Sequence, residues 1–455
     1  MQLLARQWLD MLAPSNWLIS NPTVLKTAID TQGASLARGA AHALDDRRQR
    51  QGLPPLQAAG PLFRPGIEVA WSPGQVVHRN HLIELIQYAP MTPRVQREPV
   101  FIVPSWIMKF YILDLSPHNS LVRHLVGQGH TVFMLSWRNP DESDALLDMP
   151  DYLQLGVLEA LAAITRLTGG VPIHTAGYCL GGTLLAIAAA ALARPQAVAV
   201  PGAQTIAPLA SMTLLAAQID FRDAGDLGVL IDEAQVATLE DTMAERGFLT
   251  GRQMGGSFQF LHAQDLVWSA RMREYLLGQP DLPNDLMAWN ADVTRMPATM
   301  HSHYLRNLYL HNDLAEGRYE VDGAPVALGD VRLPIFAVGT VKDHVTPWRS
   351  AFKVQRLAHA DTRFVLTSGG HNAGIGSEPG HAGRSDQLMP HRANDPQLAP
   401  EDWQRQAPHF TGSWWPAWHA WLVAHGHGTV PARRLEATAT LGPAPGSYVQ
   451  VRYDD

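Results

Sequence analysis

The feature that most constrains this chain is a sharp turn that joins an apolar strand to an apolar helix. Residues 171–177 (VPIHTAG) are typical of a buried strand and residues 183–193 (TLLAIAAAALA) of a buried helix, with GYCLG (177–181) between them. Such a turn needs glycines because the helix and the strand approach closely. Its central residue stands at a helix N-terminus, which favours negative charge. The pattern therefore predicts a nucleophile at Cys179, the only cysteine in 455 residues; a buried, inert cysteine is the alternative.

Short apolar runs alternate with helical segments on both sides of this turn. The runs that predict strands lie at 100–106, 131–137, 171–177, 333–340 and 362–368. Strands that alternate with helices form a mostly parallel sheet with helices on both faces. We therefore expect an α/β fold.

This alternation divides the chain into four regions. It stops near residue 211, where a mostly helical insert begins, and it resumes near residue 326. An insert at this place in an α/β sheet is the position of a cap or lid. The expected regions are a helical N-terminal region (1–65), a first part of the core (66–210), the cap (211–325) and a second part of the core with a tryptophan-rich segment (326–455).

The N-terminal region contains one segment with a helical pattern, residues 20–46. Asn21 is suited to cap this helix and Pro22 to occupy its first turn. Its apolar stripe predicts either packing within its own domain, which we expect, or a partner surface. Residues 75–90 follow a turn signal and have the character of strands.

Two later residues complete a catalytic triad in a recognisable order. In α/β-hydrolases an acid and then a histidine follow the nucleophile, each just past a strand end. Asp343 and His371 each lie three residues beyond a predicted strand. We therefore predict the α/β-hydrolase fold with the triad Cys179, Asp343 and His371. His344 is the rival histidine, but because it adjoins the acid in sequence we expect it only to support the site.

The oxyanion that forms during nucleophilic attack needs N–H donors. The first is expected from Leu180, which follows the nucleophile. The second is expected from the loop VPSWIMKF (103–110), whose proline has no N–H. This leaves Trp106 or Ile107, and we assign Ile107 as the donor and Trp106 as a supporting residue. Lys109 in the same loop either has a structural role or meets a phosphate group.

Composition and spacing exclude several other functions. The net charge of −7 argues against a nucleic-acid surface, and a single cysteine allows no internal disulfide. His301 and His303 are two residues apart, so on a helix they do not face one ligand, and no zinc-ligand spacing occurs. There is no Walker A motif and no G-x-G-x-x-G motif. We therefore expect no metal and no bound cofactor.

The N-terminus does not have the layout of a signal peptide, because Asp10 interrupts its apolar run. The longest bland run, residues 183–193, is too short to cross a bilayer. We therefore expect a cytoplasmic protein without a transmembrane segment.

Around GYCLGG (177–182) the sequence resembles the polyhydroxyalkanoate synthases, an α/β-hydrolase family whose box is G-x-C-x-G-G with a nucleophilic cysteine. The resemblance extends over most of the chain and is closer to the short-chain (class I-like) type. It implies that the family's cysteine, aspartate and histidine fall on Cys179, Asp343 and His371. Further similar stretches are NHLIELIQYAP (80–90), residues 106–141, DFRDAGDLGVLIDE (220–233), AWNADVTRMP (288–297), DHVTPWRS (343–350) and GSWWPAWHAWL (412–422).

The resemblance also implies a reaction. The family joins (R)-3-hydroxyacyl units from coenzyme A thioesters into a polyester and releases coenzyme A. Coenzyme A is then the leaving group of the substrate and not a cofactor. The implied partners are the growing polyester chain or granule surface and a second copy of the chain, and the implied location is the surface of cytoplasmic granules.

The chain departs from the family pattern at particular places. Met108 stands where the family usually has asparagine in W-I-N-K, and Ser105 replaces a common proline. Around His371 the sequence SGGHNAG (368–374) differs from the more usual SGHIAG. The N-terminal region, to which the family partly assigns dimerisation and granule attachment, is shorter than in many relatives.

A thiol suits this chemistry because its attack on a thioester gives another thioester, so the bound acyl group stays activated. We expect His371 to take the proton from Cys179, and Asp343 to assist when the incoming 3-hydroxyl is deprotonated. The cap is expected to exclude water. The alternatives are a cysteine-type thioesterase or polyester hydrolase on the same fold, and a non-catalytic protein of the granule surface.

Overall fold

The computed structural model describes residues 8–54, 62–195, 198, 205–251, 253–254, 268–279, 284–433 and 440–452. Contacts divide the chain into two compact units. The smaller unit takes Met1–Phe63 with Thr250–Ala288, and the larger takes Arg64–Leu249 with Trp289–Asp455. This division differs from the expected regions, because the middle of the predicted cap packs with the N-terminal region.

The larger unit is built on one ten-stranded sheet in the order β1-β2-β5-β4-β6-β7-β12-β13-β14-β15. The strands from β5 to β13 in this order are parallel, and antiparallel pairs flank them at both edges. This arrangement confirms the predicted α/β fold. The strands are β1 (Gly74–Arg79), β2 (Ile83–Tyr88), β4 (Val100–Val103), β5 (Val132–Trp137), β6 (Ile173–Tyr178), β7 (Leu209–Leu215), β12 (Ile335–Thr340), β13 (Thr362–Thr367), β14 (Ser385–His391) and β15 (His409–Thr411).

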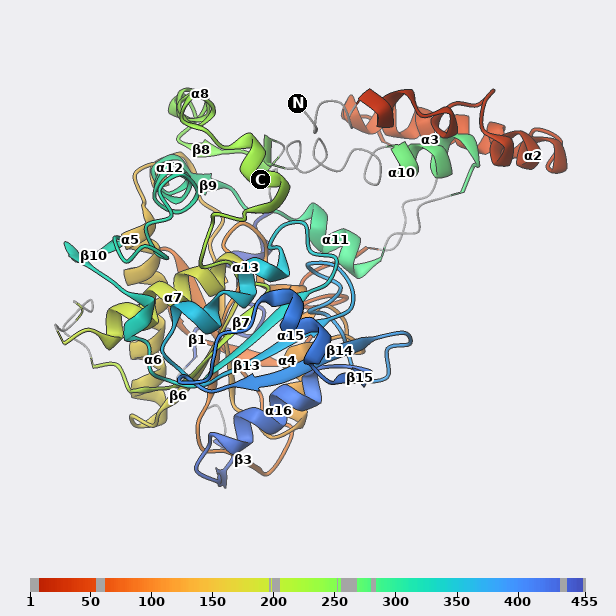
Figure 1. Cartoon of the computed structure of the whole chain (residues 1–455). Coiled ribbons are helices and arrows are strands. Elements are labelled where there is room, and N and C mark those ends of the chain that lie inside the picture. Colours follow the sequence, from red (N-terminus) through yellow and green to blue (C-terminus); the bar gives the residue numbers. More distant parts are fainter. Residues whose placement is uncertain are drawn as a thin grey trace. The chain divides into compact units, whose positions relative to one another are not determined.

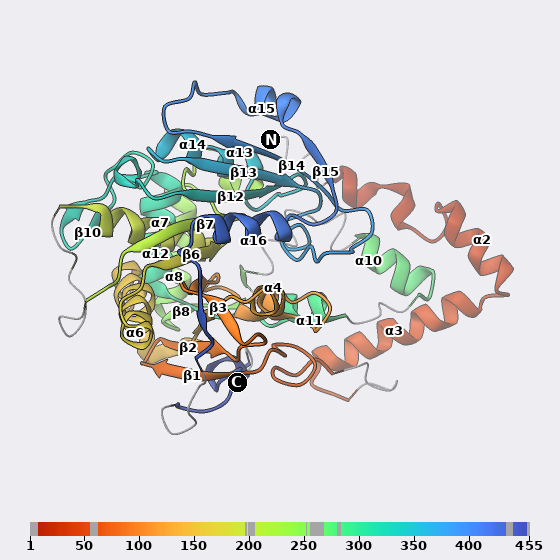
Figure 2. The same ribbon diagram turned by 90° about the horizontal axis from the view of Figure 1, so that it is seen from below.

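Helices cover both faces of this sheet (Figure 1). One face carries α6 (Glu159–Thr168), α7 (Leu180–Ala193) and α13 (Trp348–Phe352), and the other carries α4 (Leu121–Gly127) and α16 (Trp415–Ala424). The view from below places α4 and α16 along the central strands (Figure 2).

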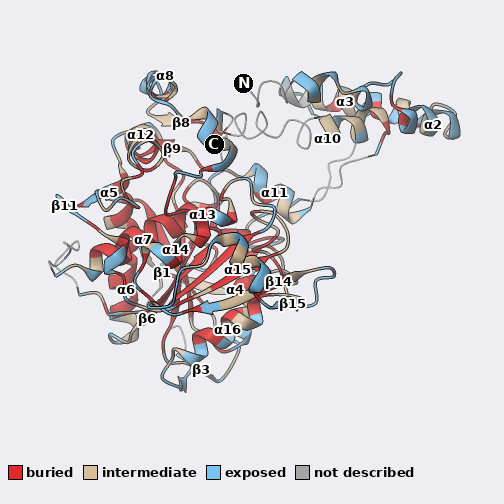
Figure 3. Ribbon diagram, viewed as in Figure 1, coloured by how far each residue is buried: buried red, intermediate tan, exposed pale blue. Residues whose placement is uncertain are grey.

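The core lies between the central strands and α7 (Figure 3). Every residue of β4, β5, β6 and β12 is buried. Helix α7 is buried from Leu180 to Ala191, and its run of alanines lets it lie close to the sheet. The helix after the turn is thus buried along nearly its whole length, as its apolar sequence predicts.

The sequence located most of these strands to within a few residues. Residues 75–90 form the hairpin of β1 and β2. One boundary was wrong: residues 211–215, assigned to the cap, belong to β7, which lies between β6 and β12 in the sheet. Periodicity does not distinguish so short an apolar run from a buried piece of helix.

Between β7 and β12 the larger unit carries helices, as expected of a cap. They are α8 (Glu233–Ala244), the end of α11 (Asp285–Ala291), α12 (Ala298–His303) and the π-helix η9 (Tyr304–Leu310). Arg306 of η9 donates at 2.8 Å to Glu240 and at 2.8 Å to Glu233, both on α8. These ion pairs join η9 to α8.

The smaller unit contains α2 (Pro22–Asp30) and α3 (Ala34–Arg50), together with α10 (Ser269–Arg271) and the π-helix η8 (Met272–Leu276). Asn21 caps α2 as predicted, accepting from the N–H of Thr23 at 2.9 Å. The single helix predicted over 20–46 is two helices. They part at Gln32 and Gly33, which have φ of 51° and 84°.

Helix α3 packs against η8, far away in the sequence. A Cβ on Gly39 would lie 1.9 Å from the carbonyl oxygen of Tyr275, so only glycine allows this approach. Arg38 Nε donates to the Gly278 carbonyl at 3.2 Å, and the Tyr275 hydroxyl donates to Asp46. Among the described residues, no helix combines the length and the apolar character that a bilayer crossing requires.

Candidate active site

Cys179 lies at the tip of the turn between β6 and α7. Its backbone has a conformation that residues other than glycine rarely adopt. Its φ is 53° and its ψ is −126°. Three glycines make room for this turn. A Cβ on Gly177 would lie 2.4 Å from the Cα of Gly182, and one on Gly182 would lie 2.3 Å from the Cβ of Ala217. The turn is therefore tightly packed on both sides, and the Cys179 residue is only 8% exposed.

The turn lies at the point where the strand order of the sheet reverses. The chain runs from β4 outward to β5 and then returns to β6 on the other side of β4. In open α/β sheets, ligands bind beyond the carboxyl ends of the strands at such a place. A Cβ on Gly181 would meet the carbonyl oxygens of Val103 at 2.2 Å and Pro104 at 2.4 Å, so the loop after β4 abuts the turn.

Two predicted oxyanion donors belong to these neighbouring segments. Leu180 is the first residue of α7, so its N–H has no acceptor within the helix. Ile107 lies in the turn after β4, where its carbonyl accepts from the N–H of Thr294 at 3.0 Å. That both N–H groups bind the oxyanion stays a prediction.

Trp106 lies beneath the cap. It is 1% exposed, and its ring meets those of Tyr152 and Tyr304 edge-on at centroid distances of 6.0 and 5.9 Å. Its carbonyl accepts from Thr294 Oγ1 at 2.5 Å. Trp106 therefore joins the loop after β4 to the cap by packing, which is consistent with the supporting role that we predicted and leaves that role untested.

The Lys109 side chain is turned away from the reaction centre. Its Nζ donates to the carbonyls of Val451 at 2.8 Å and Tyr448 at 3.3 Å, and the residue is 3% exposed. Of the two roles considered for Lys109, the structural one therefore agrees with its surroundings. A phosphate contact does not.

Asp343 follows β12, and its carboxylate is buried. Its Oδ1 accepts from the N–H groups of Val345 at 2.9 Å and Thr346 at 2.8 Å. Its Oδ2 accepts from Thr340 Oγ1 at 3.1 Å and is 2.8 Å from Nδ1 of His371. The carboxylate side chain is 0% exposed. Both oxygens are occupied, so the geometry favours an orienting role over direct contact with an incoming hydroxyl.

His371 follows β13 and lies between the acid and the thiol. Burial by itself lowers the pKa of His371. The charges of Asp343 and Cys179, together with the hydrogen bonds to both residues, outweigh this effect and raise the pKa to about 10. The surroundings of His371 thus favour the protonated imidazole. The structure brings the three predicted triad residues together in the order nucleophile, histidine, acid.

His344 is exposed and does not replace His371 in this arrangement. Its carbonyl would lie 3.1 Å from a Cβ on Gly225, at the start of the cap. A cavity of about 510 Å³ lies here, lined among others by Phe221, Tyr309 and Pro347. A supporting role for the His344 side chain stays a prediction.

Sequence reasoning missed the residues that hold the loop of the histidine. The indole N–H of Trp414 donates to the Gly374 carbonyl at 3.0 Å, and that of Trp415 donates to the Ile375 carbonyl at 2.9 Å. The tryptophan-rich segment was the signal, because a buried indole N–H needs an acceptor. That the tryptophan-rich segment packs against the histidine loop could be learned only from the fold.

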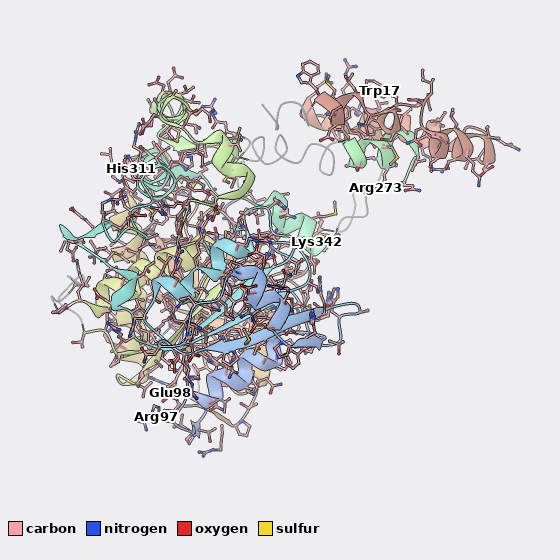
Figure 4. The ribbon with its side chains drawn as sticks, viewed as in Figure 1. Trp17, Arg97, Glu98, Arg273, His311 and Lys342 are labelled. Carbon is pink, nitrogen blue, oxygen red and sulfur yellow. The ribbon has the colours of Figure 1, made fainter. Side chains whose placement is uncertain are left out.

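The acid loop and the histidine loop are also joined by their backbones. The N–H of Lys342, labelled in Figure 4, donates to the Gly369 carbonyl at 2.9 Å. A Cβ on Gly374 would lie 2.7 Å from Cγ2 of Thr340, so the histidine loop is also in close contact with the end of β12. In the described parts of the chain, no three side chains of His, Cys, Asp or Glu are grouped as metal ligands.

Comparison with known proteins gives consistent matches. A family model of the poly-beta-hydroxybutyrate polymerase N-terminus matches residues 1–125, and one of the alpha/beta hydrolase fold matches residues 98–377. A poly(3-hydroxyalkanoate) polymerase of Methylorubrum extorquens is 40% identical, with 98% of this chain and 72% of the relative covered. Poly(3-hydroxyalkanoate) polymerase subunits of Rhizobium meliloti and Cupriavidus necator are each 37% identical over 98% of this chain, and 71% and 74% of those relatives are covered.

Proposed function

We infer that this chain, which belongs to the poly(3-hydroxyalkanoate) polymerase family, polymerises (R)-3-hydroxyacyl units from their coenzyme A thioesters through an acyl-enzyme on Cys179. The observation that carries the inference is the strained cysteine at the carboxyl ends of the central strands, beside a buried Asp343–His371 pair. Polymerases of the same family that match this chain over nearly its whole length support it.

In the first half-reaction the Cys179 sulfur attacks the thioester carbonyl. His371 holds the proton that leaves the thiol, and Asp343 orients and stabilises the imidazolium. The N–H groups of Leu180 and Ile107 are the proposed donors to the oxyanion. Collapse of the tetrahedral intermediate breaks the bond to the coenzyme A sulfur, which leaves with the proton from His371. One thioester replaces another, so the acyl group remains activated.

In the second half-reaction the 3-hydroxyl of another hydroxyacyl group attacks the acyl carbon on Cys179. His371 accepts the hydroxyl proton as the oxygen ester forms and the sulfur leaves. Asp343 acts through the histidine here as well, because both of its oxygens are already occupied. We therefore propose this indirect role, while the sequence suggested that Asp343 assists when the 3-hydroxyl is deprotonated.

Water competes with the hydroxyl in this second step. A thioesterase or polyester hydrolase would use water, and the relatives do not favour that alternative. The cap residues that pack on the loop after β4 support the exclusion of water, since Thr294 bonds to both Trp106 and Ile107. The assembled triad also disfavours a non-catalytic role.

The test is incubation with (R)-3-hydroxybutyryl-CoA, following thiol release and turbidity together. A polymerase releases coenzyme A and produces turbidity, with little free 3-hydroxybutyrate. Thiol release with free acid and no polymer would identify a hydrolase. No thiol release with acyl-CoA substrates of several chain lengths would support a non-catalytic protein.

We also propose that the smaller unit contacts the surface of polyester granules. Several of its large apolar side chains are strongly exposed, among them Ile19 at 84%, Ile29 at 76% and Leu9 at 71%. Pairing with a second copy is the competing use of this surface. Granule contact and pairing are distinguished by comparing the wild type with the Ile19→Asp/Ile29→Asp variant in sedimentation with amorphous polyester granules. Loss of sedimentation supports granule contact, whereas a change in oligomeric state alone supports pairing.

A further inference from the structure

Tyr178 and Asn372 lie beside the catalytic histidine, and the mechanism above does not use them. Tyr178 is the last residue of β6, directly before Cys179, and it is 1% exposed. The ring centroids of Tyr178 and His371 are 5.5 Å apart, with their planes inclined by 37°. The phenol ring therefore forms one wall of the space in which the imidazole could turn.

The Tyr178 hydroxyl is in turn held by the amide of the residue after the histidine. It donates to Asn372 Oδ1 at 2.6 Å, and Asn372 Nδ2 donates to Asn290 Oδ1 at 3.4 Å. Burial, together with the charges of Cys179 and Asp343, raises the pKa of Tyr178 well above its ordinary value, so the phenol keeps the proton that it donates.

Asn372 directly follows the catalytic histidine in SGGHNAG (368–374). An apolar side chain at this position would offer no acceptor to the Tyr178 hydroxyl, and a buried hydroxyl without a partner is unfavourable. The buried Tyr178 hydroxyl therefore depends on the Asn372 amide for its hydrogen-bond acceptor.

We propose that Tyr178 and Asn372 act together as positioning residues for His371. Asp343 holds the imidazole at Nδ1, and the phenol ring, itself fixed by the Asn372 amide, keeps the ring from turning away from Cys179. Correct orientation of a proton-transfer group contributes directly to rate. The proposal rests on the triad of the proposed function, because the pair acts through His371.

The test compares Asn372→Leu, Tyr178→Phe and the double variant by two readouts. The first is the rate of alkylation by iodoacetamide as a function of pH, which reports only on Cys179 because the chain has no other thiol. The second is steady-state coenzyme A release from (R)-3-hydroxybutyryl-CoA. The first readout needs no substrate, so it tests the pair even if the proposed reaction is wrong.

Asn372→Leu leaves the phenol unpaired beside the imidazole. We expect kcat to fall about 10-fold with KM changed less than about twofold, because orientation and not binding is lost. Alkylation slows at neutral pH, and its pH profile shifts. Tyr178→Phe keeps the ring and costs about threefold. The double variant has no unpaired hydroxyl, so it recovers to the level of Tyr178→Phe.

Tyr448→Phe is the matched control, since that hydroxyl donates at 2.6 Å to the Asn80 carbonyl away from the triad. It should leave the alkylation profile as in the wild type. The proposal is overturned if Asn372→Leu changes neither readout, or if the double variant is slower than each single one. If Asn372→Leu does not fold, the double variant still decides: a rate and profile matching Tyr178→Phe support the pair, and a further loss overturns it.

Discussion

At Cys179 the backbone holds a positive φ that glycine adopts freely and other residues do not. Strain of this kind costs about 1–3 kcal/mol and persists only where the surroundings enforce it. The tight contacts of Gly177, Gly181 and Gly182 supply that enforcement. The strained turn places the sulfur at the N-terminus of α7, close to His371.

Two substitutions at Cys179 measure this strain. Cys179→Ala and Cys179→Gly both remove the sulfur and abolish acyl transfer, but only glycine relieves the backbone. We expect Cys179→Gly to be at least as stable as Cys179→Ala, although glycine for alanine within an element ordinarily costs about 0.5–1 kcal/mol. Urea denaturation checks this, and a glycine variant less stable by that ordinary amount contradicts it.

Asp343→Asn tests the charge that contributes most to the raised pKa of His371. The pKa of His371 is raised to about 10 in the folded protein, so the pair stabilises the fold fully below the ordinary histidine pKa near 6.5. This contribution disappears as the pH rises through about 10. We expect the variant to be less stable by about 2 kcal/mol at pH 6, as for hydrogen bonds to charged groups, and the difference to shrink above pH 10. A difference independent of pH would be contrary to this account.

The same variant separates the roles open to the acid in catalysis. If Asp343 acts only by orienting His371, acylation and elongation slow by the same factor. Rapid-quench measurement of the first coenzyme A released, compared with the steady-state rate, checks this. A burst of about one coenzyme A per site followed by a stall would show instead that Asp343 serves the second half-reaction, as the sequence first suggested.

At the scale of elements, the close approach of α7 to the loop after β4 defines the site. A Cβ at Gly181 would lie 2.2 Å from the Val103 carbonyl oxygen, whereas one at Gly127 meets nothing within 4 Å. We expect Gly181→Ala to lose more than about 4 kcal/mol of unfolding free energy or to fail to fold. Gly127→Ala, at the end of α4, is the control and should be neutral or slightly stabilising. Equal Tm values for the two variants would show that the turn is less tightly packed.

Much of this arrangement was predictable because local signals and the global fold agree there. The apolar strand, the glycines and the buried helix around Cys179 specify one turn, and Asp343 and His371 each follow a strand with an apolar centre. The boundary at 211 failed because LASMTLL has no period that distinguishes strand from helix. The bonds from Trp414, Trp415 and Tyr178 join residues distant in sequence, so no local pattern reveals them.

At the scale of the whole molecule, the smaller unit is assembled from two segments that are separated in the sequence by the strands β1 to β7 of the larger unit. The contact of Gly39 with the backbone of Tyr275 makes its helix pairing sensitive to one methyl group. The pairing of α3 with η8 therefore needs both segments of the chain.

Gly39→Ala tests this pairing. Helix propensity alone predicts that alanine stabilises α3 by about 1 kcal/mol, while the 1.9 Å approach to the Tyr275 oxygen predicts disruption. We expect the packing to decide. Hydrogen exchange should become faster in α3 and in Met272–Leu276, while the strands of the larger unit keep their protection. Slower exchange in α3 would show that the pairing is loose.

The central claim, a covalent acyl chain on Cys179, is tested most directly by mass spectrometry of the protein quenched during reaction with (R)-3-hydroxybutyryl-CoA. We predict a mass increase by whole multiples of one hydroxybutyryl unit, located on the peptide that contains Cys179 and absent in Cys179→Ala. An acyl group found on another residue, or polymer formation by Cys179→Ala, would contradict the account.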